Sequence, residues 1–229
     1  MKILPNTLHW LKSGKAGIGL LFPAILVIGI FISCEDTLME EVLVYDNDFS
    51  GEDLTGFENG KFHVFNGDTV LGYFNDEKFK LDLSGLPPHN TIKVTINLLL
   101  HDSWDGNSDN VGGPDFWYLD MDGKNILRTT FSNSPCESLY CLYQSFPNNY
   151  PRLHKPKTGN ADTGLPGRCQ YAQIPGWTTR YRISKIISHS SSALELVCGD
   201  ALKQENAANP ECDESWSVER IQVSTMTVN

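Results

Sequence analysis

Residues 78–100, KFKLDLSGLPPHNTIKVTINLLL, decide the fold class of this chain. Every second residue from Phe79 to Leu83 is apolar, and the residues between them are charged. The same alternation runs from Ile92 to Leu98, with Lys, Thr and Asn in between. Successive side chains of a β-strand point to opposite faces, so each segment is predicted to bury one face and expose the other.

Eight further segments have β-type composition and are bounded by Gly, Asn, Asp or Pro clusters. They are 42–49, 61–65, 69–74, 116–121, 125–131, 178–188, 193–197 and 216–228. No segment has the spacing of a long amphipathic helix. The sequence therefore predicts an all-β chain folded as an antiparallel β-sandwich, and a jelly roll is the favoured type.

Three local features refine this prediction. The dipeptide Asp122-Gly123 separates two apolar runs, which is typical of a tight β-hairpin. The apolar spacing changes from two to three between Val218 and Ile221, which predicts a β-bulge between them. Residues 132–176 are rich in Pro, Asn, Gly and Tyr without periodicity, and loops of this length are usually functional or held by cross-links.

The chain contains six cysteines, which in an exported protein indicate disulfides. If Cys34 carries a lipid, five remain. The predicted disulfides join the pairs closest in sequence, Cys136 with Cys141 and Cys198 with Cys212, and Cys169 is left over. A zinc site is the alternative, but no Cys or His pair has zinc-ligand spacing.

The first 33 residues have the features of a signal peptide. Three lysines precede an apolar run from Ala16 to Ile32, and the small Ser33 comes before Cys34. The run is near the lower length limit for spanning a bilayer, so a retained membrane anchor is the alternative.

The segment FISC, residues 31–34, resembles the lipobox of bacterial lipoproteins, in which the cysteine receives the lipid and becomes the first residue. The acidic pair at residues 35–36 resembles the surface-export signal of Bacteroidetes lipoproteins. These resemblances imply export, a lipid on Cys34 that inserts into a membrane, and a location at the outer membrane or cell surface. Residues 34–41 are then an acidic tether, and residues 42–229 form one jelly-roll domain.

The formal net charge is −10, and loss of the leader lysines makes the exported part more acidic. Such a surface repels phosphate backbones and anionic headgroups, so nucleic acid is excluded as a partner. Divalent cations and uncharged ligands such as glycans remain.

The densest polar cluster is HDSWDGNSDNVGGPD, residues 101–115. Asp105, Asn107 and Asp109 occupy alternate positions, a spacing that can place several oxygens around one hard cation, and Asp115 follows. These four residues are the predicted calcium ligands, although the full EF-hand pattern is absent. An ordinary turn built from Asn, Asp and Gly is the alternative.

Four motifs together resemble a widespread, mostly uncharacterised extracellular domain whose jelly roll is similar to carbohydrate-binding modules. They are DSWDG at 102–106, GPDFW at 113–117, SHSSS at 188–192 and DESWSVERIQV at 213–223. The resemblance covers most of residues 42–228 and implies a structural calcium and aromatic rings that contact sugars. Members commonly have Asp-Asn where this chain has Glu219-Arg220, which counts against a cation at that edge.

Aromatic side chains are the candidate sugar-binding residues, because their rings offer large contact areas at low entropic cost. Trp177 is the predicted platform, close to several tyrosines of the long loop. Trp104 and Tyr150 are predicted as further ligand-binding residues. Trp216 lies inside the last strand and is predicted to be core.

Enzyme motifs are missing from the sequence: it contains no nucleophile elbow, zinc-protease helix or P-loop. His101-Asp102-Ser103 contains triad residue types, but neighbours on a strand point to opposite faces. The sequence therefore favours a non-enzymatic, lipid-anchored module, stabilised by calcium, that binds a glycan or a cell-surface protein. The alternatives are a structural accessory lipoprotein of an outer-membrane complex and, third, a polysaccharide-acting enzyme.

Overall fold

The computed structural model describes residues 37–109, 113–137, 139–204 and 207–229. These residues form twelve strands and one short helix. The elements are β1 Leu38–Asn47, β2 Phe57–Glu58, β3 Phe62–Phe65, β4 Asp68–Phe74, β5 Lys78–Ser84, β6 Thr91–Asp102, β7 Phe116–Met121, β8 Lys124–Thr130, β9 Asp162–Pro166, β10 Pro175–Ser188, β11 Ala193–Ala201, α1 Pro210–Asp213 and β12 Glu214–Val228. Within the described ranges, no helix has the length and apolar character needed to cross a membrane.

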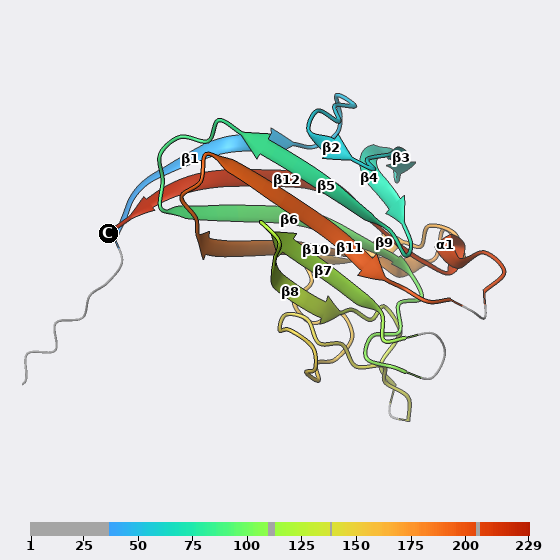
Figure 1. The fold of residues 1–229 in the computed structure, drawn as a ribbon. Coiled ribbons are helices and arrows are strands. Elements are labelled where there is room, and N and C mark those ends of the chain that lie inside the picture. Colours follow the sequence, from blue (N-terminus) through green and yellow to red (C-terminus); the bar gives the residue numbers. More distant parts are fainter. Residues whose placement is uncertain (1–36, 110–112, 138, 205–206) are drawn as a thin grey trace, which may run out of the picture. The chain divides into compact units, whose positions relative to one another are not determined.

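The strands form two antiparallel sheets that pack on each other (Figure 1). The larger sheet has the order β3-β4-β12-β6-β10-β9, and β1 pairs with the later part of β12. The smaller sheet has the order β2-β5-β11-β7-β8. The predicted all-β antiparallel sandwich of jelly-roll type is confirmed.

The core lies between the two sheets and follows the alternation of the sequence. Ile92 and Ile96 of β6 are fully buried, as are Phe79 and Leu81 of β5 in the opposite sheet. Trp216 is also fully buried, and its ring meets that of Trp117 edge to face across the core at 6.1 Å. The prediction that Trp216 is a core residue is therefore correct.

The two predicted backbone features are present. Asp122 and Gly123 both have positive φ angles, 49° and 71°, and join β7 to β8 as a two-residue hairpin turn. The register of β12 against β6 shifts between Val218 and Arg220, which is the predicted bulge.

Two parts of the fold differ from the prediction. Strand β1 begins at Leu38 and pairs with β12 as far as Val228, so the end of the predicted tether at 34–41 belongs to the sheet. Strand β9 lies inside the segment 132–176 and pairs with β10. Its sequence DTGLP has neither alternation nor β-branched runs, so β9 can be recognised only from its pairing with β10.

The disulfides correct one predicted pair. Cys136 and Cys141 are bonded, but Cys212 is bonded to Cys169 instead of Cys198. Cys198 is a free thiol, fully buried in the core within β11, whereas Cys212 lies in α1 outside the sheets. Proximity in sequence misled the prediction, because the fold brings together two cysteines that are 43 positions apart.

We expect the Cys169–Cys212 disulfide to be the more stabilising of the two. Its sequence separation is 43 against 5 for Cys136–Cys141, so loop-closure entropy gives about 4 kcal/mol against about 2 kcal/mol. Urea denaturation of the two double Cys→Ser variants measures this difference. Peptide mapping of the unreduced protein must also recover Cys198 as a free thiol; a Cys198–Cys212 peptide would contradict the structure.

Candidate functional site

One end of the larger sheet brings together several of the predicted polar residues and Trp177; we call it the loop end. Antiparallel pairing places Asp102 at the end of β6 opposite Glu214 at the start of β12. The same end of β6 pairs His101 with Thr178 of β10. The loops that leave or enter these three strands therefore meet in one place.

Asp102 organises the loop that precedes β10. Its buried carboxylate accepts hydrogen bonds from the backbone amides of Cys169 and Tyr171, each at 3.0 Å. The Cys169–Cys212 disulfide ties the same loop to α1. Asp102 had no predicted role beyond its triad residue type, yet it fixes the position of the neighbouring aromatic residues.

Tyr171 and Trp177 form the aromatic part of the loop end. Their rings stack face to face, with centroids 3.6 Å apart and planes inclined by 7°. Both side chains are half-buried, so the pair is held by the fold while part of it remains in contact with solvent. Stacking fixes the orientation of Trp177 before any ligand arrives, which lowers the entropic cost of binding.

A polar pocket of about 260 Å³ lies at the same end of the sheet and includes Gln170, the residue before Tyr171, although neither aromatic ring lines it. Its lining includes Gln170, Asn209 and Asp213, together with Ala207, Ala208 and Cys212. Ser103 Oγ lies 2.5 Å from Gln170 Oε1 and 2.9 Å from Asp213 Oδ1, so its single hydroxyl proton is donated to one of these two acceptors at a time. Amide and carboxylate groups next to an aromatic surface can match the hydroxyls and the apolar face of a sugar.

A cluster of buried carboxyl groups lies at the same end of the sheet. Asp115 and Glu214 are buried, and Asp115 Oδ1 and Glu214 Oε2 have no hydrogen-bond partner within the described residues. Burial, together with the charge of Asp105, raises the pKa of Asp115 to about 8, and burial together with the charges of Asp115 and Asp105 raises that of Glu214 well above its ordinary value. Asp115 is therefore largely protonated at neutral pH.

The predicted calcium ligands do not fit a calcium ion. Asn107 Oδ1 accepts a hydrogen bond of 2.8 Å from Ser145 Oγ and another from Thr130, so this oxygen is already used. Asp115 Oδ2 accepts backbone amides of the same loop, and Asp109 is exposed. Among the residues that the structure describes, no three His, Cys, Asp or Glu side chains form a group able to hold a metal.

The oxygens of this motif serve the loop itself. Asn107 also donates through Nδ2 to the carbonyl oxygen of Arg152 at 2.6 Å. This hydrogen bond attaches the segment 132–176, which we call the insertion, to the loop end. The turn alternative, weighed against calcium from the sequence, therefore describes the geometry better.

Two predicted ligand-binding aromatics do not join Trp177. Trp104 is fully buried, and its Nε1 donates to the carbonyl oxygen of Ser215 at 2.9 Å, so it is a core residue. Tyr150 is partly exposed, but its ring packs edge to face on Phe116 of β7 at 5.0 Å. Tyr171 was overlooked as the direct partner of Trp177, because nothing in the sequence marks a stacked pair six residues apart.

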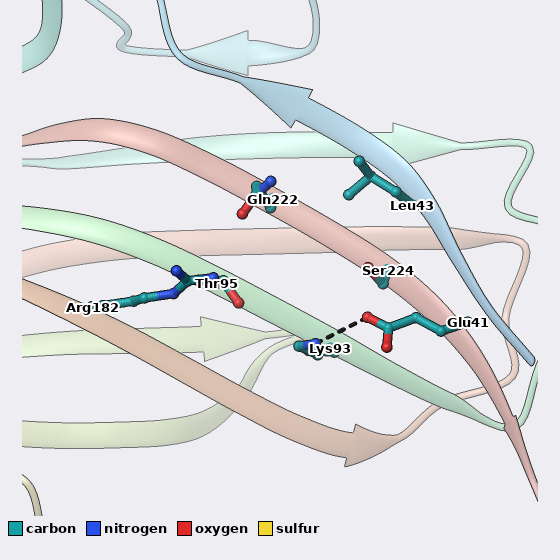
Figure 2. Close-up of a pocket in the computed structure, with 7 residues that line it drawn as sticks. All are labelled: Glu41, Leu43, Lys93, Thr95, Arg182, Gln222 and Ser224. Carbon is teal, nitrogen blue, oxygen red and sulfur yellow. Dashed lines mark hydrogen bonds and ion pairs between the residues drawn. The ribbon is translucent and has the colours of Figure 1, made fainter. Parts of the chain in front are cut away.

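A second hollow lies on the outer face of the larger sheet, and we call it the sheet-face hollow. It has a volume of about 440 Å³, within the range of small-ligand sites. Figure 2 shows its lining side chains on β1, β12, β6 and β10: Glu41, Leu43, Lys93, Thr95, Arg182, Gln222 and Ser224. An ion pair of 2.9 Å between Lys93 and Glu41 crosses it.

Comparison with known proteins gives likenesses of fold only. No family model matches the sequence, and no curated protein matches it. Solved structures that are similar include dimeric latent PorU from Porphyromonas gingivalis, at 11% identity over 83% of this chain and 13% of that chain, with a TM-score of 0.41. The chain thus spans about an eighth of the length of PorU.

Two smaller structures are similar over nearly their whole length. A family 35 carbohydrate-binding module from Clostridium thermocellum has 8% identity and a TM-score of 0.38, over 80% of this chain and 97% of that chain. A carbohydrate-binding module from Cellvibrio mixtus lichenase 5A, solved with cellotriose, has 10% identity and a TM-score of 0.35, over the same shares. At these values the comparisons assign no ligand to this chain.

We expect the stability of the fold to fall as the pH rises from 5 to 8.5. The folded-state pKa of Asp115, about 8, lies above the unfolded value of about 4, so its stabilising proton is present below pH 4 and is lost as the pH passes through 8. Asp115→Asn keeps the neutral form at every pH and should reduce the fall in melting temperature over this interval, while the raised pKa of Glu214 accounts for the remaining slope. Asp109→Asn, an exposed change in the same loop, should leave the slope as it is.

We expect the free energy of unfolding to fall by at least about 1 kcal/mol between pH 5 and 8.5, which corresponds to a decrease of about 3 °C in melting temperature for a domain of this size. Equal slopes for the unmodified protein and Asp115→Asn would show that this carboxyl group is not protonated in the fold.

Proposed function

We propose that this chain is an exported, lipid-anchored binding module without catalytic activity, which recognises a glycan at its loop end. The observation that carries this proposal is the stacked pair of Tyr171 and Trp177, with a polar pocket that begins at Gln170, the residue before Tyr171, and is also lined by Asn209 and Asp213. Amphipathic rings next to amide and carboxylate groups offer both kinds of contact that a sugar needs.

The arrangement suits binding more than catalysis. Asp115 and Glu214, two carboxyl groups of the loop end, have almost no exposed surface. A general acid or base must come within hydrogen-bond distance of the bond it acts on. These groups support the loops, and the exposed part of the site supplies contact surface.

The lipid anchor at Cys34 lies outside the described residues and is proposed from the sequence. The domain that follows begins at Leu38 in β1, at the end of the larger sheet opposite the loop end, since Leu38 pairs with Val228 and Glu214 opens the same strand. A lipid on Cys34 would therefore leave the loop end directed away from the point of attachment.

We expect mass spectrometry of the mature protein to find an N-terminal Cys34 with a diacylglycerol modification. The resemblance of FISC to a lipobox and the acidic residues after it motivate this expectation. A mature protein that retains the leader with an unmodified Cys34 would remove the anchor from the proposal while leaving the binding site untouched.

We expect Trp177→Ala to lower the affinity for a bound oligosaccharide at least tenfold, about 1.4 kcal/mol, because the stacking surface is lost. A panel of neutral gluco-, manno- and xylo-oligosaccharides identifies the ligand, and calorimetry measures the change. Tyr140→Ala, which removes an exposed aromatic ring of the insertion, is the matched control. Unchanged affinity in Trp177→Ala with an unchanged melting temperature would refute the site.

A second function has one observation in its favour. The insertion exposes Leu139 at 99%, Leu153 at 74% and Tyr140 at 61%, and apolar side chains so exposed are typical of protein contact surfaces. A structural accessory lipoprotein would use this surface to dock on an outer-membrane complex. Co-purification that Leu139→Asp abolishes, together with no binding to any oligosaccharide, would favour this second function.

A further inference from the structure

We infer that the sheet-face hollow is a second binding site, which takes a sugar bearing a carboxylate and binds that carboxylate through Arg182. The hollow lies on the larger sheet, and Arg182 pairs with Asn97 near the middle of β6. Thr178, at the loop end, is four residues away along β10, about 13 Å. The hollow is therefore separate from the site proposed at Trp177, and this inference does not depend on that proposed function.

The charges of this sheet face single out Arg182. Three other cationic side chains there have carboxylate partners: Lys93 with Glu41 at 2.9 Å, Arg180 with Glu219 at 2.6 Å, and Arg220 with Asp46 at 2.5 Å. Arg182 is exposed, and it makes no hydrogen bond or ion pair with any part of the chain that the structure describes.

An arginine without a carboxylate partner among the described residues is unexpected in such an acidic chain, and it indicates a place for an anionic ligand. The net charge is −10, so carboxylates are abundant, yet none of those in the described residues reaches this guanidinium. A guanidinium presents a planar fork of donors that matches a carboxylate in two parallel hydrogen bonds, and it keeps its charge at all physiological pH values. The free position at Arg182 therefore suits an anionic group supplied by a ligand.

The rest of the lining suits sugar hydroxyls. Thr95, Gln222 and Ser224 contribute neutral polar groups, and Leu43 contributes an apolar contact on β1 (Figure 2). Lys93 and Glu41 neutralise each other across the hollow, so Arg182 supplies its net charge. One charge among neutral polar groups corresponds to a ligand with one carboxylate among hydroxyls.

The overall charge decides between classes of anionic ligand. A polyanion such as nucleic acid or an anionic membrane would be repelled by the net negative charge of the chain. An oligosaccharide that carries a single uronate has only one charge to place, and its remaining hydroxyls can bind the neutral lining. The structure therefore favours a uronate-bearing oligosaccharide over a polyanion.

The test compares an oligosaccharide carrying one glucuronate with the same molecule methyl-esterified at its carboxylate, by calorimetry on the mature protein. We expect the free acid to bind at least tenfold more tightly than the ester. Arg182→Ala should abolish this preference, Arg182→Lys should retain part of it, and Arg152→Ala, an exposed arginine of the insertion, should change nothing. Equal binding of acid and ester, or an unchanged preference in Arg182→Ala, would overturn the inference.

Two further measurements distinguish a sugar site in the hollow from binding at the loop end and from binding of any small anion. Trp177→Ala should leave binding of the glucuronate oligosaccharide intact, whereas loss of that binding would place the ligand at the loop end and overturn the assignment to the hollow. Inorganic sulfate should compete only weakly with the oligosaccharide. Displacement by sulfate as effective as that by free glucuronate would show that the hollow binds charge alone and would overturn its assignment to a sugar.

Discussion

Strand β6 is hydrogen-bonded along its length to β12 on one side and to β10 on the other, and its alternate side chains are removed from water. A shift by one residue would carry Ile92, Val94 and Ile96 to the outer face, so the register of all three strands is fixed by burial. Because three strands share this register, the loops at their ends are brought together as well. Both candidate sites depend on that alignment.

The loop end illustrates how buried polar groups position a site. Asp102 leaves the end of β6 with a carboxylate that satisfies two amides of the next loop, and the Cys169–Cys212 disulfide holds that loop to α1. Asp115 and Glu214 are also buried, and burial together with the charge of Asp105 raises the pKa of both carboxyl groups and favours the protonated forms. The stacked rings of Tyr171 and Trp177 are thus presented by a framework of hydrogen bonds and one covalent link.

The sheet-face hollow has a different physical basis. It depends on no loop, because its lining side chains all come from the four strands β1, β6, β10 and β12. Its distinguishing feature is electrostatic: the cations around it are paired within the chain, and Arg182 is not paired with any described residue. If both surfaces bind sugars as proposed, one extended glycan would contact the chain at two points, which would raise the overall affinity without a larger single site.

The sequence by itself determined the fold class, the hairpin at Asp122-Gly123, the bulge beyond Val218 and the burial of Trp216, because each depends on periodicity or on turn chemistry within a few residues. The tertiary structure alone decided which groups meet. It paired Cys212 with Cys169, placed Tyr171 on Trp177, buried Trp104, and used the oxygen of Asn107 within the loop, where calcium had been predicted. These contacts join residues whose separation in sequence carries no signal, since only the register of β6, β10 and β12 brings them into reach.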